Sequence, residues 1–234
     1  MTTALIDGDV VAYRSAFIGM NEGWMEDEAC DAAAWLTEQW AQDASCDDLI
    51  MCLSPSSTFR HDMADSYKAH RKKREKPLWL SEIRSFLAER FESITHKNIE
   101  ADDSMGILQT SMDDTVIVTV DKDLLQIRGR HWNPVKQEAY EVDCGWELFL
   151  TQWLTGDATD GYPGLKGIGP KKAAKFIEDH VECEQAIVDW YIERGHDWAH
   201  CLVQARMAMI LTAERWDDAR EEPILYVPPL PSED

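Results

Sequence analysis

The chain has 234 residues, 44% of them hydrophobic, so it can bury a full core and form one main domain with a smaller appendage. Its formal net charge of −21 argues at first against a nucleic-acid partner, because phosphate binding needs local positive potential. The six cysteines include no C-x-x-C pair and no uncharged apolar segment could cross a bilayer, so we expect a cytoplasmic protein without a zinc site or a disulfide framework.

The predicted elements alternate between strands and helices. Short apolar runs with the composition of buried strands span residues 4–6, 49–53 and 115–120. Apolar residues at helical spacing span residues 26–40 and 78–91, and Pro77 stands where a first helical turn tolerates proline. This alternation is typical of an α/β fold, in which a parallel sheet is covered by helices on both faces.

The composition changes near Thr155, where a glycine-rich stretch begins and helical segments follow to about residue 215. The end of the chain is acidic and contains several prolines, which predicts a poorly ordered tail. The expected domains are an α/β domain over residues 1–154, a helical subdomain over 155–216 and the acidic tail over 217–234.

Several carboxylates follow the predicted strands. Asp7 comes directly after the first apolar run, and Asp121 and Asp123 come after the strongest one, where open α/β sheets place their sites. An E-A-D-D group at residues 100–103 precedes an amphipathic stretch, and two further aspartates lie one helical turn apart. The candidate metal ligands are therefore Asp7, Glu100, Asp102, Asp103, Asp121, Asp123, Asp157 and Asp160.

Helix capping is the alternative for these acids, and for Asp9, Asp102 or Asp103 taken singly it is the preferred one. Carboxylates that converge at strand ends would repel one another, however, unless cations neutralise them. An all-oxygen set without histidine or cysteine suits Mg²⁺ or Mn²⁺. We therefore interpret the whole set as a site for one of these ions.

A basic run, Y-K-A-H-R-K-K-R-E-K, occupies residues 67–76, between a presumed strand and the next predicted helix. A charge run alone is usually solvated surface. This one follows the edge of the predicted site in chain order, so its side chains could reach a phosphate held there. Its candidate functional residues are Lys68, Arg71 and Lys72.

A second basic segment, G-L-K-G-I-G-P-K-K-A-A, spans residues 164–174. Its glycines suit a tight turn that approaches a ligand closely, and Pro170 marks a helix start. Two glycines alone would be a weak signal, but with the proline and the lysines they form a helix-hairpin-helix pattern, typical of sequence-independent DNA binding. The candidate DNA contacts are Gly164, Gly167, Gly169, Lys171, Lys172 and Lys175.

Five short motifs occur along the chain in a fixed order. They are L-I-D-G-D at residues 5–9, Y-K-A-H-R at 67–71, E-A-D-D at 100–103, V-D-K-D at 120–123 and G-D-A-T-D-G-Y-P-G-L-K-G-I-G-P-K-K-A at 156–173. Together they resemble the phage 5′-to-3′ exonucleases of the flap endonuclease superfamily, in particular those of T-odd phages. Five ordered motifs are hard to obtain by chance.

The resemblance implies a fold and a set of residue roles. The fold is a PIN-like parallel sheet flanked by helices, with a C-terminal helix-three-turn-helix (helix-hairpin-helix) subdomain. The eight acids above match the family's metal-site acids, with Glu100 in the outer part, and Lys68 and Arg71 match the basic pair that binds the scissile phosphate. Tyr13, with Arg14 beside it, matches an aromatic residue that stacks on a terminal base, although a core position is an equal alternative for Tyr13.

The resemblance also implies a 5′ nuclease that hydrolyses DNA with two Mg²⁺ or Mn²⁺ ions, with K⁺ often bound at the hairpin. Its substrate is DNA with a 5′ end, as duplex, flap or RNA–DNA hybrid, in the host cytoplasm if the protein is phage-encoded, and replication proteins are candidate partners. Exonuclease, flap endonuclease and RNase H activity, and the oligomeric state, stay open. The alternative function is a non-catalytic DNA-end or junction-binding protein.

One position departs from the family pattern. Most members have a further aspartate after the strand that here ends near Leu53, whereas this chain has Ser54 and Pro55. Asp47 and Asp48 precede that strand and so belong to its other end. We therefore expect one weakened metal site, and we expect Ser54→Asp to lower the Mg²⁺ concentration needed for cleavage unless the turn points away from the ions.

Overall fold

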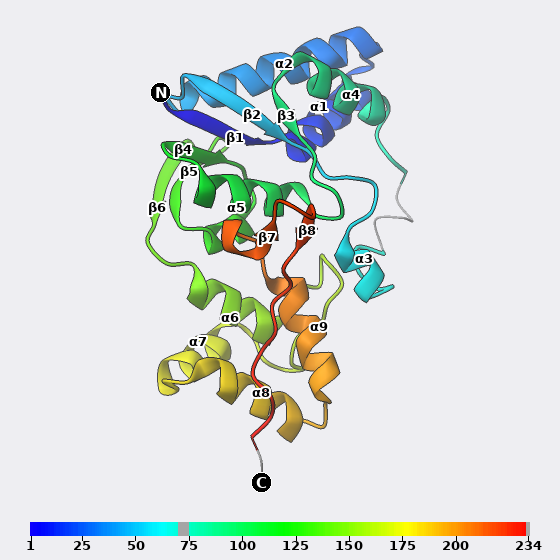
Figure 1. Ribbon diagram of the computed structural model, residues 1–234. Coiled ribbons are helices and arrows are strands. Elements are labelled where there is room, and N and C mark those ends of the chain that lie inside the picture. The colour runs from blue at the N-terminus through cyan, green and yellow to red at the C-terminus, as the bar shows by residue number, and fades with distance from the viewer. Residues whose placement is uncertain (70–74, 233–234) are drawn as a thin grey trace. The chain divides into compact units, whose positions relative to one another are not determined.

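The computed structural model of the protein describes residues 1–69 and 75–232 (Figure 1). Its contacts divide the chain into two compact units. Unit 1 consists of Met1–Thr58, Glu75–Asp143 and Ile210–Pro223. Unit 2 consists of Phe59–Arg74, Cys144–Met209 and Ile224–Asp234. Within the described residues, no helix is both long enough and apolar enough to span a membrane.

Unit 1 is built on a sheet whose described strands have the order β3-β2-β1-β4-β5-β6. These strands are β1 (Thr3–Asp7), β2 (Asp48–Cys52), β3 (Ser93–Ile94), β4 (Thr115–Val118), β5 (Gly129–Asn133) and β6 (Glu138–Val142). Neighbours from β3 to β5 pair in parallel, and β5 pairs with β6 in the antiparallel direction. The three predicted strands are confirmed, as is the parallel sheet.

Helices cover both faces of this sheet, as predicted. One layer contains α1 (Gly8–Glu22), α2 (Glu26–Asp43) and α4 (Leu80–Arg90), and the other contains α5 (Ala101–Ser111) and the 3-10 helix η2 (Lys122–Gln126). Because strand side chains alternate between faces, Ile6 of β1 packs with the first layer and Leu5 with the second. The α/β fold class is confirmed.

Two local features differ from the sequence-based expectation. The β5–β6 hairpin was not predicted; Gln137 in its turn has a φ of 54°, a left-handed conformation that few non-glycine residues adopt. Helix α4 begins at Leu80 and not at Pro77, because Trp79 before it is also left-handed, with a φ of 62°. Neither glutamine nor tryptophan favours a left-handed backbone, so the sequence does not signal these conformations at Gln137 and Trp79.

The segment Ile210–Pro223 completes unit 1. It contains η3 (Ala213–Arg215), β7 (Trp216–Asp217) and β8 (Glu222–Pro223). The N–H of Leu211 donates to Asp103 Oδ1 at 3.0 Å, and the N–H of Ala213 donates to Thr110 Oγ1 at 2.8 Å. These bonds attach the segment to α5, so unit 1 includes residues that the sequence assigns to the helical subdomain and the tail.

Unit 2 contains α3 (Phe59–Met63), α6 (Trp146–Thr155), α7 (Pro170–Asp179), α8 (Cys183–Glu193) and α9 (Trp198–Ala208). Its core includes Trp153 and Tyr191 and also Tyr67, the first residue of the basic run. Arg60, 3% exposed, donates hydrogen bonds to the carbonyl oxygens of Met207 at 3.4 Å and Met209 at 2.6 Å. Residues 59–69 therefore belong with the later helices. The domain bounds expected from the sequence placed them in the α/β domain instead.

The expectation of a poorly ordered tail is wrong over residues 217–232. Tyr226 is 5% exposed, and Trp198 Nε1 donates to the Pro229 carbonyl oxygen at 2.9 Å. Further along, Asp189 accepts both the N–H and the hydroxyl of Ser232, at 2.9 and 2.7 Å. The prediction of disorder rested on acidity and proline content, and composition alone does not reveal these hydrogen bonds to the backbone.

Candidate active site

A threonine hydroxyl connects Asp7 and Asp121 at the carboxyl ends of β1 and β4. Asp7 ends β1 and is 3% exposed; its carboxylate accepts the N–H of Val10 and the hydroxyl of Thr119, each at 3.0 Å. The same hydroxyl accepts the N–H of Asp121 at 3.0 Å. Thr119 thus sets the spacing of the two aspartates, and sequence analysis missed it because a threonine after a strand is an unremarkable residue.

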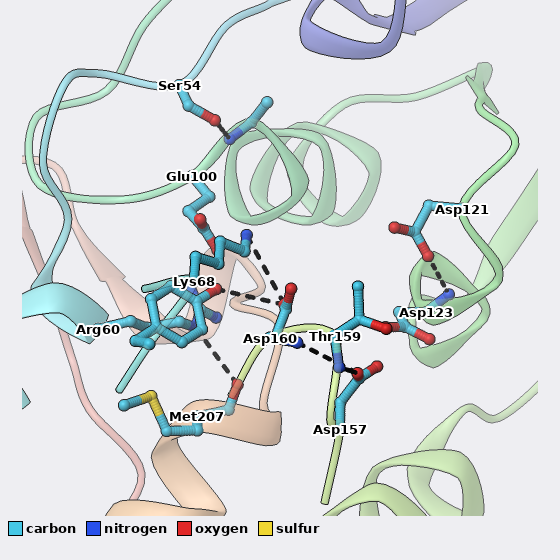
Figure 2. Close-up of polar contacts among 12 residues, drawn as sticks. Ser54, Arg60, Lys68, Glu100, Asp121, Asp123, Asp157, Thr159, Asp160 and Met207 are labelled. Atoms are coloured by element: carbon cyan, nitrogen blue, oxygen red, sulfur yellow. Dashed lines mark hydrogen bonds and ion pairs between the residues drawn. The ribbon is translucent and has the colours of Figure 1, made fainter. Parts of the chain in front are cut away.

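Asp121 and Asp123 form the start of η2. Asp121 Oδ1 accepts the N–H of Asp123 at 2.9 Å, so Asp121 caps the short helix (Figure 2). Asp121 is exposed, whereas Asp123 is half-buried. The exposed carboxylate can reach a solvated ion without rearrangement of the strand.

The E-A-D-D group forms the first turn of α5. Glu100 is the N-cap residue and forms a capping box with Asp103, whose Oδ2 accepts the N–H of Glu100 at 3.1 Å. Asp103 is fully buried, and its Oδ1 accepts the N–H of Leu211. Asp103 therefore forms the capping contact that was considered as its alternative, and Asp102 is the more accessible of the two aspartates.

The pKa of Cys52 reports negative charge at the end of β2. Cys52 pairs in register with Asp7 and is fully buried. Burial, and then the charges of Asp7 and Asp102, raise the pKa of its thiol. The carboxylates of Asp7 and Asp102 therefore both lie close enough to the Cys52 thiol to affect its pKa, although they come from different elements.

Ser54 and Asp9 are engaged in contacts within unit 1. Ser54 Oγ accepts the N–H of Ala101 at 2.9 Å, so the hydroxyl faces the start of α5 (Figure 2). Asp9 forms an ion pair with Arg84. The Asp9 carboxylate therefore forms a salt bridge and does not cap the helix. The effect expected for Ser54→Asp stays a prediction.

The donor set fits a hard cation that retains water. Among the residues that the structure describes, no group of three or more histidine, cysteine, aspartate or glutamate side chains is arranged to hold an ion. Mg²⁺ usually keeps several waters and is held by one or two carboxylates together with substrate phosphates. Oxygen donors such as Asp7 and Asp121 therefore suit Mg²⁺ or Mn²⁺ better than an ion that needs a closed cage.

Asp157 and Asp160 lie in a loop of unit 2 with a tight local structure. Asp157 Oδ1 accepts the N–H groups of Thr159 at 2.5 Å and Asp160 at 3.2 Å (Figure 2). The backbone of Asp157 also pairs with Tyr162. These bonds fix the Asp157 carboxylate and the backbone of Asp160 within unit 2.

Lys68 lies beside Asp160. Its N–H donates to the Asp160 carbonyl oxygen at 2.9 Å, and its ammonium lies 3.7 Å from Asp160 Oδ2 (Figure 2). The hydroxyl of Tyr67 donates to the same carboxylate at 3.5 Å. Lys68 has a left-handed φ of 47°, a strained conformation for a lysine, of the kind found at functional sites.

Gly161 allows the backbone of Ser66, just before Lys68, to pack closely against the loop that contains Asp160. Its φ is +82°, and an added Cβ would lie 2.2 Å from the carbonyl oxygen of Ser66. We expect Gly161→Ala to lower the free energy of unfolding by more than about 1 kcal/mol, because the φ and the backbone clash both oppose alanine. Chemical denaturation would measure the loss.

Gly195→Ala is the matched control, because Gly195 has a φ of +83° with nothing within 4 Å of the added Cβ. It carries the conformational cost without the clash. Equal losses for the two variants would show that the contact of Gly161 with Ser66 has no role in holding the turn.

The glycines of the hairpin have different structural requirements. Gly164, with a φ of +58°, would place a Cβ 2.3 Å from the backbone of Gly156, and its N–H donates to Gln204 Oε1 at 2.8 Å. Gly167 has a φ of +79° with open space around it. Gly169 precedes Pro170 at the start of α7 and has neither a positive φ nor a close neighbour. The fold itself therefore does not require glycine at position 169, although close approach of a ligand would.

The three lysines of the hairpin pattern are exposed on α7. Lys172 Nζ donates to the Gly167 carbonyl oxygen at 3.2 Å, and Lys175 forms an exposed ion pair with Asp179 at 3.0 Å. Lys171 and Lys175, together with Glu147, line a hollow of about 540 Å³ in unit 2. The structure thus keeps the lysines next to the hairpin glycines and accessible to a ligand.

The remaining predicted contacts lie on α1 and in the basic run. Tyr13 is 49% exposed, so it is not a core residue, and Arg14 beside it is exposed as well. Base stacking by Tyr13 stays a prediction. Arg71 and Lys72 lie outside the described residues.

The fold and the acids define a class: an α/β protein with a parallel sheet and carboxylates at the carboxyl ends of its strands. The family described as "5'-3' exonuclease, N-terminal resolvase-like domain" matches residues 2–146. The chain belongs to this 5′-3′ exonuclease family. The resemblance noted in the sequence is thereby confirmed.

Known relatives include cellular and phage proteins. The chain is 30% identical over 205 residues to DNA polymerase I of Deinococcus radiodurans, covering 79% of this chain and 21% of the polymerase. It is 32% identical over 135 residues to the exonuclease of Escherichia phage T7, covering 52% of this chain and 44% of that protein. The chain therefore spans only a fifth of the polymerase and less than half of the phage exonuclease.

A solved structure shares the fold over most of the chain. It is the bacteriophage T5 flap endonuclease in a pseudo-enzyme–product complex with DNA and metal ions. The TM-score is 0.69 at 16% identity, covering 90% of this chain and 89% of that one.

Proposed function

We propose that the protein is a divalent-metal-dependent 5′ nuclease that hydrolyses DNA phosphodiester bonds. The observation that carries the proposal is the placement of Asp7 and Asp121 at adjacent parallel strand ends, joined by Thr119, in a chain of the 5′-3′ exonuclease family. Support also comes from the T5 flap endonuclease, which shares the fold and was solved with DNA and metal ions.

The proposed cofactor is Mg²⁺ or Mn²⁺, with two ions per active enzyme. Such ions polarise the phosphate, generate a hydroxide nucleophile and stabilise the leaving oxygen. Asp7, Asp102, Asp121 and Asp123 of unit 1 are proposed ligands, with Glu100 in the outer part of that group. Asp157 and Asp160 of unit 2 are further proposed ligands. We assign Asp103, fully buried and bonded to two backbone N–H groups, to orienting α5.

Lys68 and Arg71 are the proposed catalytic cations. They would bind the scissile phosphate and offset the charge that develops on it during in-line attack. Support for this role of Lys68 is that its backbone N–H binds the Asp160 carbonyl oxygen while its ammonium lies beside the Asp160 carboxylate, one of the proposed metal ligands. Lys72 is a proposed DNA contact in the same run.

The hairpin is the proposed site for the DNA backbone. Gly167, Gly169 and the N-terminus of α7 offer backbone N–H groups, and the nearby lysines offer positive charge. Gly164 holds the turn itself. A K⁺ ion at the hairpin, and stacking of Tyr13 with Arg14 on a terminal base, are parts of the same proposal.

We expect simultaneous replacement of Lys171, Lys172 and Lys175 by alanine to weaken DNA binding with little effect on the chemical step. The slope of log K against log salt should fall by about 0.9 for each lysine that contacts a duplex phosphate. Binding titrations at several salt concentrations measure it. An unchanged slope would exclude these lysines as backbone contacts.

The proposed function has one direct test. Blunt duplex, 5′-flap and RNA–DNA hybrid substrates are each incubated with the protein in Mg²⁺ and in EDTA. We expect cleavage in Mg²⁺ and none in EDTA, and the substrate that is cut fastest identifies the activity. DNA binding without Mg²⁺-dependent product from any substrate would instead support the alternative, a non-catalytic DNA-end or junction-binding protein.

A further inference from the structure

The loop that follows β2 is joined by hydrogen bonds to three helices of unit 1. The N–H of Ser54 donates to Asp9 Oδ2, in the first turn of α1, at 3.1 Å. Ser54 Oγ accepts the N–H of Ala101, the first residue of α5, at 2.9 Å. The Ser54 carbonyl oxygen accepts an N–H of Arg84, from α4, at 2.5 Å. One serine therefore connects α1, α4 and α5.

Arg84 closes this network. One guanidinium nitrogen binds Asp9 and the other binds the Ser54 carbonyl oxygen, and the side chains of Arg84 and Asp9 are 31% and 29% exposed. A planar guanidinium can bridge two acceptors in this way, whereas a lysine ammonium presents a single point of charge. Arg84 thus fixes α1 and the loop after β2 to the same point of α4.

The network connects two groups of proposed metal ligands. Asp7 and Asp9 flank Gly8, where an added Cβ would lie 2.8 Å from the carbonyl oxygen of Cys52, so this turn lies directly against the end of β2. On the other side, Ala101 stands between Glu100 and Asp102. A shift of Ser54 would therefore move the turn of Asp7 relative to the first turn of α5.

We propose that Ser54 and Arg84 are positioning residues that fix Asp7 relative to the turn of Glu100 and Asp102 and so support the binding of a hydrated divalent cation by these carboxylates. This inference rests on the proposed function, because it assumes that these carboxylates are ligands. It gives Ser54 a role through its contacts with α5 and Asp9 and does not require a carboxylate at this position.

The network is better suited to fixing geometry than to adding stability. A partly buried ion pair adds little net stability, because the loss of hydration offsets most of the attraction between its charges. By contrast, removing a residue that orients a metal ligand typically costs 10- to 100-fold in metal affinity, so we expect about a tenfold effect here. The test therefore measures cation affinity directly.

Mn²⁺ binding to the full chain without DNA, followed by the electron paramagnetic resonance of free Mn²⁺, provides this measurement. We expect Arg84→Met and Ser54→Ala each to raise the Mn²⁺ Kd by about tenfold. Ser54→Thr keeps the hydroxyl and should restore binding close to that of the wild type. Arg84→Lys should give an intermediate Kd, because it keeps the charge but not the bridge.

Arg90→Met is the matched control. Arg90 lies on the same helix and also pairs with an acid, Glu38 at 3.1 Å, but both side chains are at least half exposed. Its loss removes the same charge without touching the network, so the Kd should not change. Circular dichroism at the binding temperature shows which variants are folded, and the smaller Ser54→Ala change provides an independent test if Arg84→Met does not fold.

The outcomes separate this inference from the proposed function. A folded Ser54→Ala protein with the wild-type Mn²⁺ Kd overturns the positioning role while leaving the metal site intact. An equal rise in Kd for Arg90→Met overturns it too, because the loss of affinity would then not depend on the contacts of Arg84 with Asp9 and Ser54. Wild-type protein that binds no Mn²⁺ and cuts DNA in EDTA would remove the proposed function and this inference together.

Discussion

Replacement of Asp121 by asparagine is expected to reduce DNA cleavage by at least about a hundredfold, the scale of losing one electrostatic stabiliser in an active site. Asparagine keeps an Oδ1 that can accept the N–H of Asp123, so the cap of η2 and the strand end should survive. Only the negative charge offered to a cation is lost. Single-turnover cleavage in Mg²⁺ measures the effect, and DNA affinity in EDTA should stay close to that of the wild type.

Asp113→Asn is the control for this change. Asp113 is exposed in the turn before β4, at the end of the strand opposite to Asp121, and its replacement removes the same charge. Cleavage by Asp113→Asn should equal that of the wild type. Near-normal turnover by Asp121→Asn in Mg²⁺ would refute the assignment of Asp121 as a metal ligand.

Lys68→Ala is expected to slow single-turnover cleavage by about a hundredfold or more while changing DNA affinity by much less. The reason is that the proposed contact of Lys68 strengthens as charge develops on the phosphate, so it acts mainly on the chemical step. Arg71→Ala should behave in the same direction. Rapid-quench kinetics at saturating enzyme separate this step from binding.

A second readout distinguishes Lys68 from a metal ligand. Because its ammonium lies 3.7 Å from Asp160, alanine at position 68 removes a competing cation from that carboxylate, so the Mg²⁺ requirement should not rise. Lys136→Ala, in the exposed turn between β5 and β6, loses the same charge and should leave the rate unchanged. Equal losses in affinity with no change in the chemical step would contradict a catalytic role for Lys68.

Much of unit 1 could be predicted from the sequence because its strands and helices have regular patterns. The run at residues 115–120 is β-branched and apolar, and in the structure all four residues of β4 are buried. The placement of Asp7 and Asp121 followed from the same reasoning, since acids after parallel strands share one edge of the sheet.

The features that sequence analysis missed depend on contacts between segments far apart in the chain. Thr119 is an ordinary residue until its hydroxyl lies between Asp7 and Asp121, and Arg84 is an ordinary helix residue until Asp9 and Ser54 meet it. Periodicity describes which face of an element is buried. It does not describe the partner of a single polar group, so positioning residues are harder to predict than ligands.

The division into discontinuous units affects how the protein can be cut into parts. The chain passes between the units at five places, after Thr58, Arg74, Asp143, Met209 and Pro223. A fragment ending near residue 154 would lack Leu211, whose N–H binds Asp103, and would carry residues 59–69 without the helices that cover Tyr67. Independent expression of either half should therefore yield incompletely folded material, and a proteolytic nick at any single crossing should not release a functional fragment.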